Sequence, residues 1–172
     1  MASTYVNIAS QTLSTTAASV AFTSIPNTYT DLAVRCSTRA DSTSASLNLY
    51  LRFNNSSAAT YSYRLLHSTG TTAYSEGTSG SGFINTRNAA QTDIATANTF
   101  SNVEMYIPNY NSSTNKPAWT FGTAENNATL AFISTTAALR SNTEAITQVN
   151  ILPASGNFLA GSTFYLYGIK KS

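Results

Sequence analysis

The sequence predicts an all-β protein, an antiparallel β-sandwich of jelly-roll-like type with about eight to ten strands. Three observations support this class. Apolar and polar residues alternate along several segments, turn-forming clusters of Asn, Pro and Gly separate those segments, and the evidence for helices is thin. At 172 residues the chain is expected to form a single domain over residues 1–172, with a short N-terminal arm and a basic C-terminal tail.

The clearest strand is Leu47–Phe53, in which every second residue is apolar and the residues between them are Asn48, Tyr50 and Arg52. This alternation is typical of a half-buried strand. Leu32–Cys36 and Val103–Ile107 follow the same pattern. The segment Phe164–Ile169 is apolar on both faces, as expected of a strand that lies between the core and a neighbouring strand.

Weaker alternation predicts further strands. These candidates are Tyr5–Ile8, Val20–Thr23, Tyr61–His67, Leu130–Thr135 and Ile146–Leu152. Two segments are expected to lie outside the sheets. Gly70–Gly82 is rich in Gly, Ser and Thr and is expected to form a mobile surface loop, and the Ala- and Asn-rich segment Thr86–Thr99 is expected to hold a short helix or a long loop.

The composition limits the class of partner. Charged residues make up only 9% of the chain, while Ser and Thr together supply 51 of 172 residues. The regular aromatic and β-branched runs argue against disorder. Apart from Lys170 and Lys171 the basic residues are scattered, so no nucleic-acid partner is expected. No stretch approaches the roughly 18 apolar residues of a membrane span, so no membrane insertion is expected, and no secretory signal is recognised.

Residues with catalytic chemistry are few. Cys36 is the only cysteine and lies in phase with a run of apolar residues, which predicts a small buried side chain and no disulfide. His67 is the only histidine, and nothing in the sequence brings the carboxylates of Glu76, Glu104 and Glu125 together. Neither a nucleophile elbow nor a phosphate-binding loop is present. We therefore expect no enzyme activity, no catalytic residues and no cofactor; a metal held by backbone carbonyls and scattered Asp or Asn stays open.

Aromatic residues near predicted loops and strand ends are candidates for contact with a ligand or partner, because exposed Tyr and Trp can stack on sugars or anchor an interface. For Trp119 and Phe121, which share one face of their segment, core packing is the preferred interpretation; for Tyr74 neither interpretation is preferred. The candidate contact residues, with the terminal lysines included, are Tyr61, Tyr63, Tyr74, Tyr110, Trp119, Lys170 and Lys171.

Several segments together resemble one known group. They are the opening segments Ile8–Leu13 and Val20–Leu32, the middle segments Leu51–Asn55 and Tyr61–Tyr63, and the closing segment Gly161–Ile169. With these segments the chain resembles the small β-rich virion structural proteins of tailed bacteriophages. The resemblance spans most of the chain and is weakest between about residues 86 and 115.

That resemblance implies a capsid decoration (cement) protein on the outer surface of the virion. It would be made in the cytoplasm of the host bacterium, bind the major capsid protein at capsomer junctions, and associate with itself as a homodimer or homotrimer. The alternative is a tail-associated or receptor-binding domain that recognises host surface glycans. A carbohydrate-binding module and, last, an enzyme that depends on His67 remain as rival classes. The resemblance carries no active-site residues over to this chain.

Overall fold

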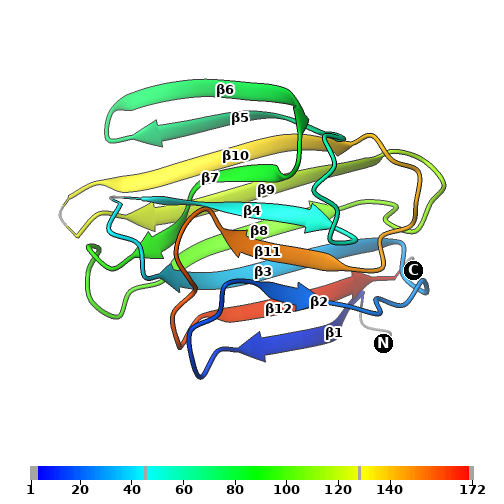
Figure 1. Cartoon of the computed structure of the whole chain (residues 1–172), viewed down its shortest axis with the longest axis horizontal. Helices are drawn as coiled ribbons and strands as arrows, with labels where there is room; N and C mark the ends of the chain where they lie inside the picture. Colours follow the sequence, from blue (N-terminus) through cyan, green and yellow to red (C-terminus); the bar gives the residue numbers. More distant parts are fainter. Residues whose placement is uncertain (1–3, 45, 128, 171–172) are drawn as a thin grey trace.

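The computed structural model describes residues 4–44, 46–127 and 129–170, and all its regular elements are strands (Figure 1). The predicted all-β class is confirmed, with twelve strands in place of about eight to ten. The strands are β1 (Tyr5–Thr12), β2 (Val20–Phe22), β3 (Asp31–Ala40), β4 (Leu47–Phe53), β5 (Tyr61–Thr69), β6 (Thr72–Ser81), β7 (Ile84–Thr92), β8 (Ser101–Ile107), β9 (Lys116–Glu125), β10 (Ala131–Arg140), β11 (Val149–Pro153) and β12 (Thr163–Ile169).

The strands form two layers. The larger layer has the order β1-β12-β3-β8-β9-β10-β5-β6, and the smaller layer has the order β2-β11-β4-β7. Figure 1 shows β2, β11 and β4 of the smaller layer lying across the larger one. A short parallel pairing between β3 and β7, at Arg39↔Gln91 and Ala40↔Thr92, joins the layers. Every other strand pairing in the described residues is antiparallel, so the fold is a mostly antiparallel β-sandwich in which β7, at the edge of the smaller layer, meets the end of the inner strand β3 of the larger layer.

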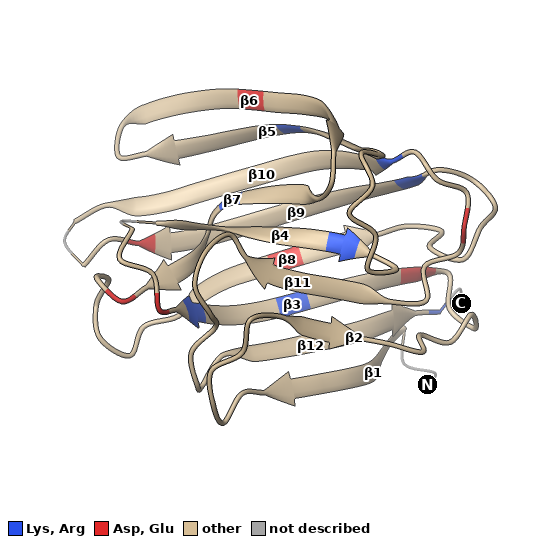
Figure 2. Cartoon of the chain, in the orientation of Figure 1, with Lys and Arg blue, Asp and Glu red and all other residues tan. Residues whose placement is uncertain are grey.

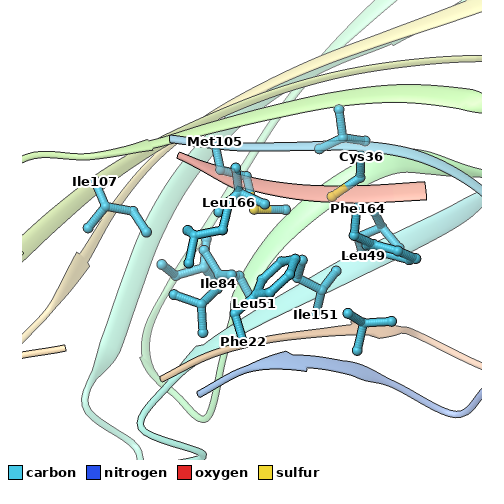
Figure 3. Close-up of a cluster of buried hydrophobic side chains, with 14 of the residues drawn as sticks. Phe22, Cys36, Leu49, Leu51, Ile84, Met105, Ile107, Ile151, Phe164 and Leu166 are labelled. Carbon is cyan, nitrogen blue, oxygen red and sulfur yellow. The ribbon is translucent and has the colours of Figure 1, made fainter. Parts of the chain in front are cut away.

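The hydrophobic core lies between the two layers. Along β4 the predicted apolar positions Leu47, Leu49, Leu51 and Phe53 are buried, and the residues between them are half-buried. The same alternation is confirmed in β8 and, at its apolar positions, in β3. The segment Phe164–Ile169 was expected to be buried on both faces, and this is wrong: in β12 Phe164 and Leu166 are buried, whereas Tyr165 on the other face is exposed. Side chains of both layers meet in Figure 3: Phe22, Leu49, Leu51, Ile84 and Ile151 from the smaller layer, and Cys36, Met105, Ile107, Phe164 and Leu166 from the larger.

Of two expectations about irregular segments, the first is wrong and the second holds only for residues 93–99, which are irregular. The predicted loop Gly70–Gly82 holds β6, which pairs with β5 along its length. The predicted helix or loop Thr86–Thr99 begins as β7, which is buried at eight of its nine residues. The backbone of β7 packs closely on β9: a Cβ at Gly122 would lie 3.1 Å from the Cβ of Ala89. Because this gap admits only small side chains, β7 has few of the large apolar residues by which a strand is recognised.

The predicted strand Tyr5–Ile8 is confirmed as part of β1, which pairs antiparallel with β12. The backbone N–H of Lys170 also donates to the carbonyl of Thr4 at 3.0 Å, so the two ends of the described chain are joined. Lys171 lies outside the described residues. Within the described residues there is no helix of the length and apolarity that a membrane crossing requires.

Candidate interaction surface

The larger layer has a region of inverted polarity in the middle of β9, β10 and β5. Residues that face the smaller layer are buried, and four of them carry a hydroxyl or no side chain: Thr120, Gly122, Ser134 and Thr136. Residues on the opposite, outer face include exposed large apolar side chains: Leu66 (59% exposed), Ile133 (46%) and Trp119 (42%). A sheet with one solvated face normally places its apolar residues inward and its polar residues outward. At these positions the arrangement is reversed, whereas Leu65 and Phe132, which also face the smaller layer, follow the usual pattern.

The hydroxyl residues of the inner face pack against β7 and bond to it. The hydroxyl of Thr86 donates to the hydroxyl of Thr120 at 2.9 Å, and the hydroxyl of Thr136 donates to the carbonyl of Asn85 at 2.9 Å. These bonds satisfy hydroxyl groups that would otherwise be costly to bury. At Gly122 a side chain would meet Ala89, so this region has no room for a large residue.

On the outer face, strand register gathers four side chains into what we call the apolar patch: Leu66, Trp119, Phe121 and Ile133. Leu66 lies opposite Thr135, which lies opposite Phe121. The indole N–H of Trp119 donates to the hydroxyl of Thr135 at 2.8 Å, and the rings of Trp119 and Phe121 stack with centroids 6.2 Å apart. The patch is therefore a fixed surface assembled from three strands.

Two hollows adjoin Leu66. One, of about 270 Å³, is lined by Leu66, Phe121 and Ile133 together with Ala73 and Tyr74 of β6. The other, of about 260 Å³, lies between Leu66 and Trp119 and also touches the aliphatic Ala137 and the charged Arg64. Because carbon atoms make up most of the first hollow's lining, it fits an apolar side chain better than a polar group.

Toward β12 the outer face carries charged and tyrosine side chains in place of aliphatic ones. Arg35 and Glu104 form an ion pair at 3.2 Å, and Glu104 lies opposite Phe121. Beyond them Tyr165 is 37% exposed and stacks on Tyr167 with centroids 6.4 Å apart. In Figure 2 the charged residues are spread over many strands and loops, so the described surface presents no clustered basic footprint.

Two of the predicted contact residues belong to the interior. Tyr61 and Tyr110 have no exposed surface. The backbone N–H of Phe53 donates to the hydroxyl of Tyr61 at 2.9 Å, and the hydroxyl of Tyr110 donates to the carbonyl of Pro26. Both tyrosines tie turns to the core, which explains their position near strand ends. In the folded domain neither can contact a partner, and this corrects the sequence prediction for these two residues.

The remaining predicted residues lie nearer the surface. Trp119 belongs to the apolar patch, so its expected core packing is wrong. Tyr74 is 45% exposed on β6 and stacks on the ring of His67 with centroids 5.0 Å apart. Tyr63 is half-buried on β5, and Lys170 is exposed directly after β12. Tyr74 thus lines the first hollow, Trp119 lines the second, and Lys170 lies at the end of another strand.

The sequence pattern does not identify Leu66 and Ile133 as surface residues. Each stands in a candidate strand where an apolar residue is expected to face the core. The register of β5 and β10 sets them beside Phe121 on the outer face, and that register depends on contacts between strands far apart in sequence. The only local signal was the hydroxyl residues Ser134 and Thr136, which occupy the inward positions of β10.

His67 lies in a polar cluster between the layers. Its Nε2 is 3.0 Å from the Glu76 carboxylate, which also pairs with Arg87 at 3.2 Å. Ser134 stands opposite His67 in the β5–β10 pairing. A Ser–His–acid composition is therefore present, but Ser134 is 1% exposed, so a substrate has no access to its hydroxyl. Over the described ranges, no group of three or more His, Cys, Asp or Glu side chains is placed to hold a metal ion.

Two further cations are buried at the opposite end of β10. Lys116 is fully buried and donates to backbone carbonyls, among them that of Ser112 at 2.7 Å. Burial, and then the neighbouring charge of Arg140, lower the pKa of Lys116. Arg140 pairs with Glu144 at 3.4 Å and lies over the ring of Tyr61 at 5.9 Å. These contacts hold the turns at this end of the sandwich together, away from an accessible surface.

The fold and the apolar patch together define an all-β sandwich that exposes an apolar sheet face. Neither a protein-family model nor a curated protein sequence matches the chain. Among solved structures it is similar to a scytalido-glutamic peptidase bound to a transition-state analogue inhibitor, with 12% identity and a TM-score of 0.27 over 92% of this chain and 66% of that one. It is also similar to SCP-B, an Eqolisin-family peptidase in complex with the tripeptide Ala-Ile-His, with 12% identity and a TM-score of 0.25 over 92% of this chain and 65% of that one. The chain thus spans just under two thirds of either peptidase chain, and likenesses this weak assign it no activity.

Proposed function

We propose that this chain is a non-catalytic assembly protein that docks onto another protein through the apolar patch. The observation that carries the proposal is the inverted polarity of β9, β10 and β5. Exposed apolar groups that are contiguous and rimmed by polar residues mark interaction sites. Full burial of a Leu, Ile or Phe side chain contributes about 1.5–3 kcal/mol relative to its exposure. Leu66 and Ile133 stay largely exposed after folding, so their burial by a docked partner would contribute favourable free energy to binding.

The partner is a protein surface in preference to a glycan. Sugar recognition needs convergent hydrogen-bonding groups beside an aromatic ring. In the patch the indole N–H of Trp119 already donates to Thr135, and Leu66, Phe121 and Ile133 offer only carbon. Apolar anchors in hollows of this kind are typical of protein interfaces. Glycan recognition through Trp119 and Tyr74 is the second candidate, since both aromatic rings are more than two-fifths exposed.

More specifically, we propose that the protein decorates the outside of a bacteriophage capsid and that its partner is the major capsid protein. The resemblance of the opening and closing segments to virion proteins supports this form. The low charge, 9% of residues, also supports it, because crowded copies on a shell would repel one another little. Many modest contacts on a lattice give avidity without a strong local motif.

The chain offers a closely matched pair of variants to test the proposal. Ile133 in the patch and Ile94 in the turn after β7 are the same residue type, and both are 46% exposed. In co-sedimentation with undecorated capsids, Ile133→Ser should weaken binding by about tenfold or more, which corresponds to about 1.4 kcal/mol. Ile94→Ser should bind as the wild type does. Equal effects of the two variants would contradict the patch, and a wild-type protein that leaves capsids bare would contradict decoration.

A glycan array distinguishes glycan recognition, the second candidate function, from docking onto a protein. Under the proposal the wild-type protein binds no glycan specifically. Specific glycan binding that is lost in Trp119→Ala would favour host recognition over capsid docking.

Immunogold electron microscopy of virus particles gives the location directly: label over the heads supports decoration, and label confined to tails supports the alternative.

A further inference from the structure

The outer edge of β6 is an unpaired strand edge of unusual length. β6 is ten residues long and pairs with β5 on one side only. Within the part of the chain that the structure describes, no strand pairs with its other side, and β6 ends the larger layer. Its residues are mostly exposed. Such an edge presents backbone N–H and C=O groups that can template pairing with another chain.

β6 carries only two of the devices by which proteins protect strand edges, the inward-facing charge of Glu76 and a register shift near its C-terminal end. Short length, Lys, Pro and bulges are the usual ones. β6 contains neither Lys nor Pro, and its pairing shifts only near its C-terminal end, between Tyr61 and Ser62 of β5. The other edges differ: β1 is interrupted between Asn7 and Ala9, and β2 has three residues. Of these edges, β6 is the one suited to a continuous pairing.

We infer that β6 pairs antiparallel with β6 of a second copy of this chain. Two identical antiparallel strands obey two-fold symmetry, so one edge serves both partners. The only charged residue of β6, Glu76, is compensated within its own chain by Arg87 at 3.2 Å, and its carboxylate also lies 3.0 Å from Nε2 of His67. The related Glu76 of the second copy therefore adds little repulsion. Alternate positions on the outer face of β6 are small, among them Ala73 and Ser75, which permits close approach.

This pairing would orient both apolar patches toward the same side. The two-fold axis of an antiparallel pair stands perpendicular to the sheet, so the outer faces of the two larger layers become one surface. The hollow lined by Ala73 and Tyr74 lies next to the shared edge. Here the inference rests on the proposed docking function: a dimer with two patches on one side would bind a lattice with higher avidity than a monomer.

Sedimentation equilibrium over a concentration series tests the pairing. The wild-type chain should form a dimer, and the double variant Ser75→Lys/Ser79→Lys, which places like charges across the shared edge, should weaken dimerisation by about a hundredfold. The matched control is Ser10→Lys/Thr12→Lys, which adds the same charges at exposed positions on β1 and should stay dimeric. A wild-type chain that is monomeric throughout, or a control that dissociates equally, would overturn the inference.

Hydrogen exchange on the unmodified protein gives an independent readout that does not depend on any variant folding. Backbone amides of β6 should gain protection as the protein concentration rises. Exchange that is independent of concentration would overturn the pairing. The docking proposal fails separately: Ile133→Ser should stay dimeric while losing capsid binding, whereas the Ser75→Lys/Ser79→Lys monomer should keep weak capsid binding.

Discussion

Gly168 in β12 lies flat against the aromatic ring of Tyr29. A Cβ at this position would stand 2.3 Å from Cγ of Tyr29 and 2.5 Å from both Cδ atoms. Carbon atoms in contact normally lie about 3.5–4.0 Å apart, so Gly168→Ala creates an overlap of about an ångström or more. β12 is held between β1 and β3, where Gly168 pairs with Val6 and Leu32. The half-buried ring of Tyr29 must therefore move.

The expected cost follows from this overlap. Forcing a methyl group into a packed region destabilises a protein by about 1–3 kcal/mol. Alanine is otherwise the better strand residue, because glycine in a strand interior is unfavourable by about 0.5–1 kcal/mol. In a Tyr29→Ala background, where the ring is absent, Gly168→Ala should thus be neutral or slightly stabilising. The effect of one substitution changes sign with the presence of one ring.

Urea unfolding of the four proteins in this double-mutant cycle measures the coupling directly. We expect Gly168→Ala to lower the free energy of unfolding in the wild-type background and to leave it unchanged or raise it without the ring. An equal loss in both backgrounds would refute the contact with Tyr29 as the cause. No loss in the wild-type background would refute the close approach itself.

Three further predictions concern the core and its titratable groups. Leu49→Ala, at a fully buried position, should lower the free energy of unfolding by about 2–5 kcal/mol; unchanged thermal melting would contradict the position of β4 in the core. The backbone N–H of Asn157 and then its side-chain amide lower the pKa of Asp41, so this carboxylate stabilises the fold above its unfolded pKa, and that contribution is lost as the pH falls through the lower folded pKa. Asp41→Asn should consequently flatten the dependence of Tm on pH below about pH 4, and a profile with the wild-type slope would count against the bond. Burial raises the pKa of the Cys36 thiol, so thiol reagents at neutral pH should label it only as fast as the protein unfolds, and rapid labelling of the native protein would contradict its burial.

Sequence patterns predicted the strands that bury one regular face. Leu47–Phe53 could be recognised because its apolar residues face a wide core, where large side chains fit. β7 could not, because it lies against the backbone of Gly122 and must carry small residues. β6 could not, because it is an edge strand with little burial on either face, so its Gly and Ser residues carry the pattern of a loop. Local sequence thus reports a strand only where packing demands large residues.

The same reasoning explains why the candidate surface was only half predictable. Alternation establishes which residues share a face, and Trp119 and Phe121 do share one. It does not establish which face is inward, because that depends on what packs against the sheet. Between β9 and β7 the close approach at Gly122 leaves room only for small side chains, so the large side chains of β9 occupy the outer face. A large apolar residue that alternates with Thr and Gly can therefore lie on the outer face of a sheet instead of in the core. The residues between the large ones distinguish these two positions: small or hydroxyl residues there indicate that the large residues face outward.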